Sequence, residues 1–347
     1  MPRVCVLARL GELGERAVLR RVEGLLAPQW RCRGLGPGDD AVCAGEGLED
    51  LVVKIDGGSI GSSLAPWMSY ADLGWQWVTA TASDLVAKAA KPLIFLLSVG
   101  LDPGLEEDSL YQLVGGAIES AERHGAWLGG GDTNSSRGDG WVDVAGLGRV
   151  VRLPAPGRRA QPGDLVYVTL GRLGLSGLVL HSLATGDWES ARQVFTEAFK
   201  EFTRPVARLG FLGLYRELGS DCVTAALDIS DGLAETLYQL SEKSSRVIEL
   251  RELPLVEEAV EYAKNQGIDY DALLLYGGQE YEVVFTARPG CAHEVEGTAR
   301  RNGVSVAQLG YVTEKPGTKV LMRGKVVRRA GWDNLKRDNP AITGTIQ

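Results

Sequence analysis

Aspartates recur along this chain at one kind of place, where an apolar run meets a turn of small residues. Two unit charges about 4 Å apart repel by roughly 4 kcal/mol at an effective dielectric near 20, so a fold that gathers such carboxylates usually does so to hold cations. Carboxylates, hydroxyls and backbone carbonyls are the hard oxygen ligands that suit Mg²⁺ on a nucleotide. The pattern therefore predicts a Mg²⁺-dependent enzyme that acts on phosphates. The segments are GPGDDAV (Asp39, Asp40), VVKIDGG (Asp56), ATASDLVA (Asp84), LGGGDTNSS (Asp132) and ALDISDGL (Asp228, Asp231).

Length and charge limit the remaining possibilities. A chain of 347 residues is long for one core, which favours two domains. A net charge of −8 argues against sequence-independent nucleic-acid binding, which needs a cationic face. No run approaches 18 apolar residues and the N-terminus lacks the shape of a signal peptide, so we expect a soluble, cytoplasmic protein without a membrane partner.

The cysteines and histidines give little support to other kinds of site. The five cysteines are isolated and have no C-x-x-C pair, which favours free buried thiols; a cytosolic disulfide is the alternative if the source is a hyperthermophile. The three histidines are far apart, so neither a transition-metal site nor a Ser-His-Asp triad is favoured.

Strands and helices mix throughout the chain, which predicts the α+β class. The tract LPAPGRRAQPGD (153–164) has neither a helical nor a strand-like hydrophobic period. It predicts a domain boundary, with domains at 1–152 and 153–347. The apolar run 77–82 is expected to end at Ser83 and Asp84. One of these two residues would then cap a helix that continues to Pro92. Other helices are expected at 108–124, 203–218 and 256–266, and strands at 51–55, 126–130 (buried), 164–170 and 223–229.

Three of the aspartate motifs have an ordinary structural explanation beside the functional one. Asp39 and Asp40 follow Gly-Pro-Gly, so the pair is either a cation site or a solvated turn. The glycines before Asp132 and Thr133 either let a ligand approach the backbone or form a flexible hairpin turn. In ALDISDGL, Asp231 is either a ligand-binding group at a helix N-terminus or a simple helix cap. No P-loop and no G-x-G-x-x-G after a strand is present, so a nucleotide would be held mainly through metal ions.

Taken in order and spacing, these motifs resemble those of the thiamine-monophosphate kinase family, in the superfamily of aminoimidazole-ribotide synthetase (PurM-like). The resemblance spans about residues 9–336 and includes GDDAV, DLGWQWVTATASDLVAKAA, GGDT, DISDGL, YGGQEYEVVF and GWDNL. It implies a two-domain fold with an N-terminal α/β domain that forms a homodimer and a C-terminal α+β domain. The implied reaction of thiamine biosynthesis transfers the γ-phosphoryl group of ATP, with Mg²⁺, onto thiamine monophosphate or a similar small phosphorylated substrate.

The resemblance also implies roles for individual residues. Two catalytic residues are expected, Asp132 and Asp231. The expected metal ligands are Asp39, Asp40, Asp56, Asp84, Asp132, Asp228 and Asp231. The expected nucleotide-binding residues are Asp40, Gly130, Gly131, Thr133, Arg158 and Ser230, and the expected substrate residues are Glu280 and Trp332.

The chain departs from the family pattern on the substrate side. The segment after Asp56 reads GGSIGSSLAPWMSY and lacks the family's His-Phe pair, and GGEDYEL appears as GGQEYEV, with Gln279 and Glu280 in place of two acids. Gln76 stands where a lysine is common, and an expected arginine falls on Gly157, beside Arg158 and Arg159. Two alternatives therefore stay open, namely a related ATP-dependent enzyme with another small acceptor and a non-catalytic nucleotide-binding protein.

Overall fold

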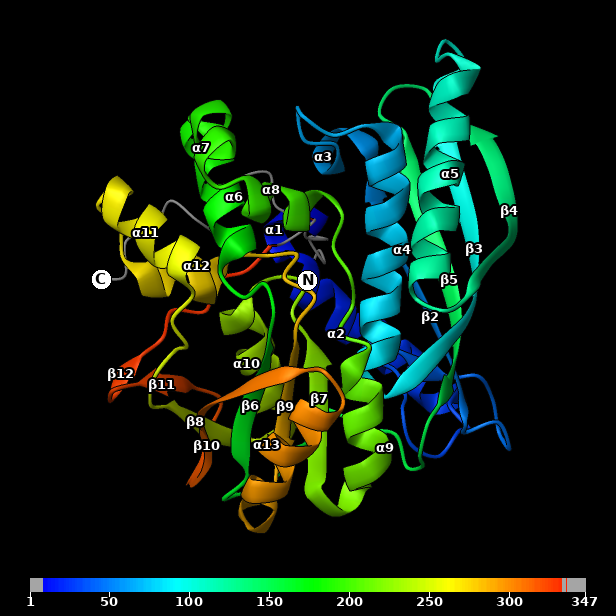
Figure 1. Ribbon diagram of the computed structural model, residues 1–347. Helices are drawn as coiled ribbons and strands as arrows, with labels where there is room; N and C mark the ends of the chain where they lie inside the picture. The colour runs from blue at the N-terminus through cyan, green and yellow to red at the C-terminus, as the bar shows by residue number, and fades with distance from the viewer. Residues whose placement is uncertain (1–8, 333–334, 336–347) are drawn as a thin grey trace, which may run out of the picture.

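Two β-sheets organise the molecule, which is described here from a computed structural model for residues 9–332 and 335 (Figure 1). The first sheet has five strands in the order β1-β2-β5-β3-β4, all from the first 150 residues. Helices α4 (Tyr70–Ala87) and α5 (Glu107–Arg123) pack side by side against one face of this sheet (Figure 1). The strands are β1 (Val42–Cys43), β2 (Leu51–Ser59), β3 (Ala90–Leu101), β4 (Trp127–Ser135) and β5 (Trp141–Val150).

Within residues 9–332, no helix covers the other face of the first sheet. Burial alternates along β5, and Val142 and Val144 point to the helices while their neighbours point away. On the uncovered face Ile55 and Trp127 are each 65% exposed, and Leu96 is also exposed. The prediction that 126–130 forms a buried strand is wrong about burial, because β4 is the edge of the sheet and almost all of its residues are exposed.

Helix α4 is the central element of the molecule. It begins at a capping box formed by Ser69 and Asp72, and it contacts strands β2, β3 and β5 of the first sheet and β7 of the second. Residues 78–90 are all buried. The expected helix start at Ser83 or Asp84 is therefore wrong, because both residues lie inside α4. A helix packed on several sides is apolar all round and lacks the one-faced period that marks a surface helix.

Two glycines let α4 and α5 approach closely. A Cβ atom on Gly74 of α4 would lie 2.0 Å from the carbonyl oxygen of Leu113, and one on Gly116 of α5 would lie 1.8 Å from that of Ala71. Any side chain at these positions would separate the helices, so the glycines fix the position of α4 over the sheet.

The second sheet has seven strands in the order β12-β11-β8-β10-β6-β9-β7. Its strands are β6 (Leu165–Leu170), β7 (Val223–Asp228), β8 (Arg246–Leu250), β9 (Val283–Ala287), β10 (Ser305–Pro316), β11 (Val320–Met322) and β12 (Lys325–Val326). Residues 151–164, where the sequence predicts a domain boundary, connect the two sheets. Together the sheets and helices confirm the predicted α+β class.

Helices surround the second sheet (Figure 1). The helix expected at 203–218 is wrong at its start, because α8 ends at Thr203, α9 begins only at Gly210, and Pro205 lies in the non-helical segment between them. The remaining helices are α1 (Leu10–Leu13), α2 (Glu15–Leu26), α3 (Ile60–Ser63), α6 (Leu175–Thr185), α7 (Trp188–Val194), α8 (Thr196–Thr203), α9 (Gly210–Cys222), α10 (Leu233–Ser244), α11 (Glu257–Gln266), α12 (Tyr270–Tyr276) and α13 (Ala292–Arg301). Among the described residues, no helix is long and apolar enough to cross a membrane.

Four of the cysteines are paired, so the expectation of free thiols is wrong for them. Disulfides join Cys32 to Cys43 and Cys222 to Cys291. Cys5 lies outside the described residues. The sequence did not show this because the partners are brought together by the fold, and the second pair is 69 residues apart.

Candidate functional site

Three of the predicted aspartates meet where the two sheets come together. Carboxylate oxygens of Asp40, Asp84 and Asp228 lie within 4.8 Å of one another, and all three side chains are buried. Asp40 follows the tight turn at Gly38, Asp84 is on α4, and Asp228 is the last residue of β7. Each comes from a different element, so the group exists only when these parts of the chain are packed together.

The Asp39–Asp40 pair is matched by two cationic side chains. The Lys88 ammonium lies 3.1 Å from Asp39 Oδ1 and 2.9 Å from Asp40 Oδ2, and the Arg158 guanidinium pairs with Asp40 and lies 3.7 Å from Asp39 Oδ1. Burial opposes the ionisation of Asp40, but the charges of Arg158 and Lys88 outweigh it and lower its pKa to about 2. This end of the site is therefore charge-balanced.

Lys54 lies close to two of the predicted aspartates, Asp84 and Asp56. Lys54 Nζ is 2.8 Å from Asp84 Oδ2, while Asp56, two residues further along β2, is half-buried. Burial raises the pKa of Asp84 well above its usual range; Lys54 opposes this shift, and the carboxylate of Asp228 adds to it. Burial disfavours the charge of Lys54, but Asp84 and Asp56 outweigh it and raise the lysine pKa.

Asp228 and Asp231 lie at the junction between β7 and α10. Ser83 donates a hydrogen bond of 3.0 Å to Asp228 Oδ2. The backbone N–H of Gln279 donates one of 2.6 Å to the carbonyl of Ser230. Helix α10 begins at Leu233 with Gly232 at the N-cap and has no side-chain cap, so the capping role considered for Asp231 is wrong.

Both carboxyls at this junction are hard to ionise. Burial raises the pKa of Asp228 to about 7, with the Asp40 charge acting in the same direction. Burial likewise raises the pKa of Asp231 to about 7, helped by Glu15 and Glu235. The carboxyls at this end of the site therefore ionise less readily than Asp40.

The GGGDT motif lies apart from the three-carboxylate group. Gly130, Gly131, Asp132 and Thr133 are exposed on edge strand β4, where Asn134 donates a 2.8 Å hydrogen bond to Asp132. In the strand register Asp132 is opposite Ser98, which is opposite Asp143 on β5. The motif thus lies at one end of the uncovered sheet face, in line with an aspartate that the sequence reading missed.

The predicted substrate residues have different environments. Glu280 is fully buried, accepts a 2.9 Å hydrogen bond from the Gly174 amide, and leaves Oε2 without a partner. Its neighbours Gln279 and Tyr281 both have left-handed backbone angles, φ 58° and 49°, which non-glycine residues rarely adopt. Burial raises the pKa of Glu280 to about 8, against the charge of Arg172. Trp332 is 46% exposed, so it is not a core residue.

The donor set suits a hard divalent cation. Asp40, Asp84 and Asp228 supply converging carboxylate oxygens, and burial together with the neighbouring carboxylates raises the pKa values of the last two, so a cation bound between them would relieve that cost. The sequence reading missed Lys54 and Lys88, although each is a lysine inside an otherwise apolar run, LVVKI and LVAKAA. Such a lysine signals a buried ion pair, because an unpaired buried ammonium is too costly.

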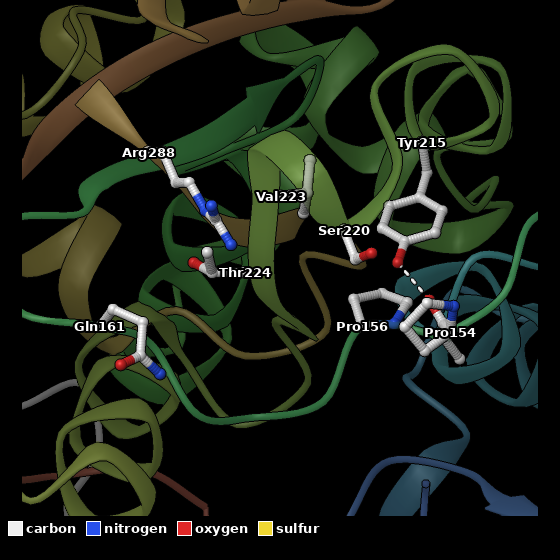
Figure 2. Close-up of a pocket in the computed structure, with 9 residues that line it drawn as sticks. Pro154, Pro156, Gln161, Tyr215, Ser220, Val223, Thr224 and Arg288 are labelled. Atoms are coloured by element: carbon white, nitrogen blue, oxygen red, sulfur yellow. Dashed lines mark hydrogen bonds between the residues drawn. The ribbon is translucent and has the colours of Figure 1, made fainter. Parts of the chain in front are cut away.

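A separate pocket of about 260 Å³ lies at the opposite end of β7 (Figure 2). Its lining includes Thr224 near the start of that strand, Ser220 at the end of α9, Arg288 and Tyr215, whose hydroxyl bonds to the carbonyl of Pro154 (Figure 2). None of the predicted site residues lines it.

Comparisons with known proteins agree with the resemblance seen in the motifs. A family model described as AIR synthase related protein, N-terminal domain, matches residues 38–150. The thiamine-monophosphate kinase of Pyrobaculum calidifontis is 31% identical over 305 residues, which cover 88% of this chain and 92% of that protein. A crystal structure of a Thermus thermophilus protein is 34% identical with a TM-score of 0.83 and covers 92% of this chain and all of its own. AaThiL, solved as a complex with AMPPCP and TMP, is 25% identical with a TM-score of 0.79, covering 94% and 99%.

Proposed function

The chain belongs to the thiamine-monophosphate kinase family, and from this premise we propose that it transfers the γ-phosphoryl group of ATP to the phosphate of thiamine monophosphate, giving thiamine diphosphate. The reaction is proposed to require Mg²⁺. The buried group of Asp40, Asp84 and Asp228 carries this proposal, because its converging oxygens suit a divalent cation.

In-line phosphoryl transfer needs positioning and charge neutralisation more than covalent chemistry. A bound Mg²⁺ would supply the neutralisation of phosphate charge. Asp84 and Asp228, held in place by Lys54 and Ser83, would hold the ion at a fixed position. The acceptor is a phosphate oxygen that is already ionised, so no strong general base is required.

The nucleotide is proposed to lie beside the β7–α10 junction. Asp231 and Ser230 stand where the N-terminus of α10 favours anions. Arg158 pairs with Asp40 and is the nearer of the two neighbouring arginines to the carboxylates; Arg159 is exposed. We assign the phosphate contact to Arg158, the arginine that lies beside the carboxylate group.

The acceptor is proposed to contact Trp332, while Glu280, which is fully buried, is proposed to shape the substrate side of the site from beneath its surface. The segment after Asp56 that differs from the family pattern is packed against the rest of the protein. Its Trp67 packs edge-on against Phe199 at 4.9 Å and donates a hydrogen bond to Thr203. The lost His-Phe pair is thus replaced by a segment anchored on α8, which supports a variant substrate loop within the same family.

A homodimer is proposed to complete the site. The uncovered face of the first sheet carries exposed apolar side chains, including Ile55, Leu96 and Trp127, and Asp132 lies at the polar end of the same face. A second copy covering this face would bury the apolar side chains and enclose Asp132, one of the two expected catalytic residues. The cytoplasmic location and the domain division at 152/153 likewise stay predictions.

The metal-ligand assignment is tested by Asp84→Asn and Asp228→Asn. Each removes one charged oxygen and should lower kcat by about 100-fold or more while the far-ultraviolet circular dichroism stays unchanged. Asp221→Asn is the matched control, since Asp221 is a surface carboxylate paired with Arg152, and it should keep full activity. Near-native turnover by either site variant at saturating Mg²⁺ would remove that residue from the site.

A further inference from the structure

Lys88 is a lysine with no exposed surface at all. Its ammonium lies 3.1 Å from Asp39 Oδ1 and 2.9 Å from Asp40 Oδ2, and donates a 2.6 Å hydrogen bond to the carbonyl of Ala226. One hydrogen bond and two ion pairs therefore surround the ammonium. A buried ammonium is costly without such partners, so these contacts hold the lysine in place.

The contacts of Lys88 join separate parts of the protein. The lysine directly follows the end of α4, its aspartate partners are on the turn after Gly38, and Ala226 is on strand β7 of the second sheet, two residues before Asp228. The ammonium thus ties the Asp39–Asp40 turn to the strand that delivers another carboxylate of the site.

Burial excludes Lys88 from contact with a nucleotide. Its charge instead lies where the oxygens of two aspartates converge, an arrangement that elsewhere in the site suits a divalent cation. We propose that Lys88 is a positioning residue that acts as a built-in cation, occupying one cation position of the carboxylate site and holding Asp39 and Asp40 in place before metal binds. The inference rests on the proposed function only in that Asp40 belongs to the metal site.

The carboxylates that Lys88 does not contact remain available to a divalent cation from solution. Asp40 has Lys88 on Oδ2 and Arg158 on Oδ1, and Asp84 has Lys54, whereas among the described residues Asp228 has a hydroxyl partner, Ser83, and no ion pair. The built-in cation therefore directs a divalent ion toward the Asp84–Asp228 side of the group.

Removal of the ammonium should create a new metal position. Lys88→Met keeps an unbranched side chain of similar length and removes its charge, leaving Asp39 and Asp40 with Arg158 alone. Without nucleotide, and with Mn²⁺ as the probe followed by electron paramagnetic resonance, the variant should bind one more Mn²⁺ per chain than the wild type. In EDTA it should melt about 10 °C lower than the wild type, and Mg²⁺ should restore most of that loss.

Thr79→Val is the matched control. Thr79 is also buried on α4 and also reaches across to a backbone carbonyl beyond the first sheet, with a 3.0 Å hydrogen bond to Pro205. This variant should melt lower than the wild type in EDTA and in Mg²⁺ alike, with unchanged Mn²⁺ stoichiometry, because it removes a bridging bond and no charge.

The number of bound Mn²⁺ ions decides the result. An unchanged number in Lys88→Met would overturn the inference and leave Lys88 a structural lysine. If Lys88→Met does not fold in EDTA, Lys88→Gln is measured in the same way, and the double variant Lys88→Met/Asp39→Asn should lose the additional ion. These readouts use neither ATP nor thiamine monophosphate, so their failure is distinguishable from failure of the proposed kinase reaction.

Discussion

At the scale of single residues, the distribution of cations among the carboxylates sets the properties of the site. Asp40 has two cationic partners and a pKa lowered to about 2, whereas burial raises the pKa of Asp228 and Asp231 to about 7. One end of the site is therefore ionised at neutral pH, and the other end is only partly ionised there, so a cation that binds it would favour full ionisation. This contrast explains how a fold can gather carboxylates and remain stable without its metal.

The same contrast predicts how the stability of the metal-free protein depends on pH. A carboxyl group whose pKa is raised in the folded state contributes stability below its unfolded value near 4, and that contribution is lost as pH rises through about 7. The melting temperature in EDTA should therefore fall between pH 6.5 and pH 8. Asp228→Asn should show a shallower fall, with the remainder due to Asp231 and to Glu280, whose pKa burial raises to about 8. A melting temperature that rises over this range would contradict the assignment.

At the scale of helices and strands, local turn chemistry made part of the site predictable. The Gly-Pro-Gly turn before Asp39 and the strand that ends at Asp228 are where the sequence predicts them, because glycine and aspartate mark turns directly. Helix α4 was misplaced because packing on several sides removes its amphipathic period, although the Ser69–Asp72 capping box marks its true start.

Long-range pairings were beyond the reach of sequence reasoning. Nothing local indicates that Lys88 meets the Asp39–Asp40 turn, or that β4 is an edge strand, because both depend on which elements become neighbours. The Cys222–Cys291 disulfide is a further case, since it joins the end of α9 to the segment after β9 across 69 residues.

That disulfide should have a measurable effect on stability. Closing a loop of 69 residues restricts the unfolded chain, so Cys222→Ser/Cys291→Ser should lower the free energy of unfolding by about 4 kcal/mol in chemical denaturation. Cys32→Ser/Cys43→Ser opens a loop of only 11 residues and should cost less, about 3 kcal/mol. Thiol titration of the unfolded wild type should find one free thiol, from five cysteines less four paired. Five titratable thiols would show that neither bond forms.

At the scale of the whole molecule, the site depends on both sheets at once. Asp40 and Asp84 come from the first half of the chain and Asp228 from the second, and α4 packs against both sheets (Figure 1). The Gln76 side chain of α4 further bonds to the carbonyl of Phe202 at 2.8 Å, across the same junction. Relative movement of the two sheets would separate the carboxylates, so a close junction is a condition of metal binding.

The proposed dimer is tested on the uncovered sheet face. Ile55→Asp places a charge among the exposed apolar side chains of this face and should convert a dimer to a monomer in light scattering, with loss of activity. Leu255→Asp changes a leucine that is 81% exposed but lies outside this sheet, and it should leave both properties intact. A wild-type protein that is monomeric and fully active would contradict the dimer proposal.

The most direct test of the account is phosphorus NMR of the wild-type protein incubated with ATP and thiamine monophosphate, with and without Mg²⁺. The account predicts that thiamine diphosphate and ADP appear together in equal amounts when Mg²⁺ is present, and that neither forms in EDTA. Formation of ADP and inorganic phosphate without thiamine diphosphate, or product formation that persists in EDTA, would contradict the claim that the buried aspartates serve metal-dependent transfer to this acceptor.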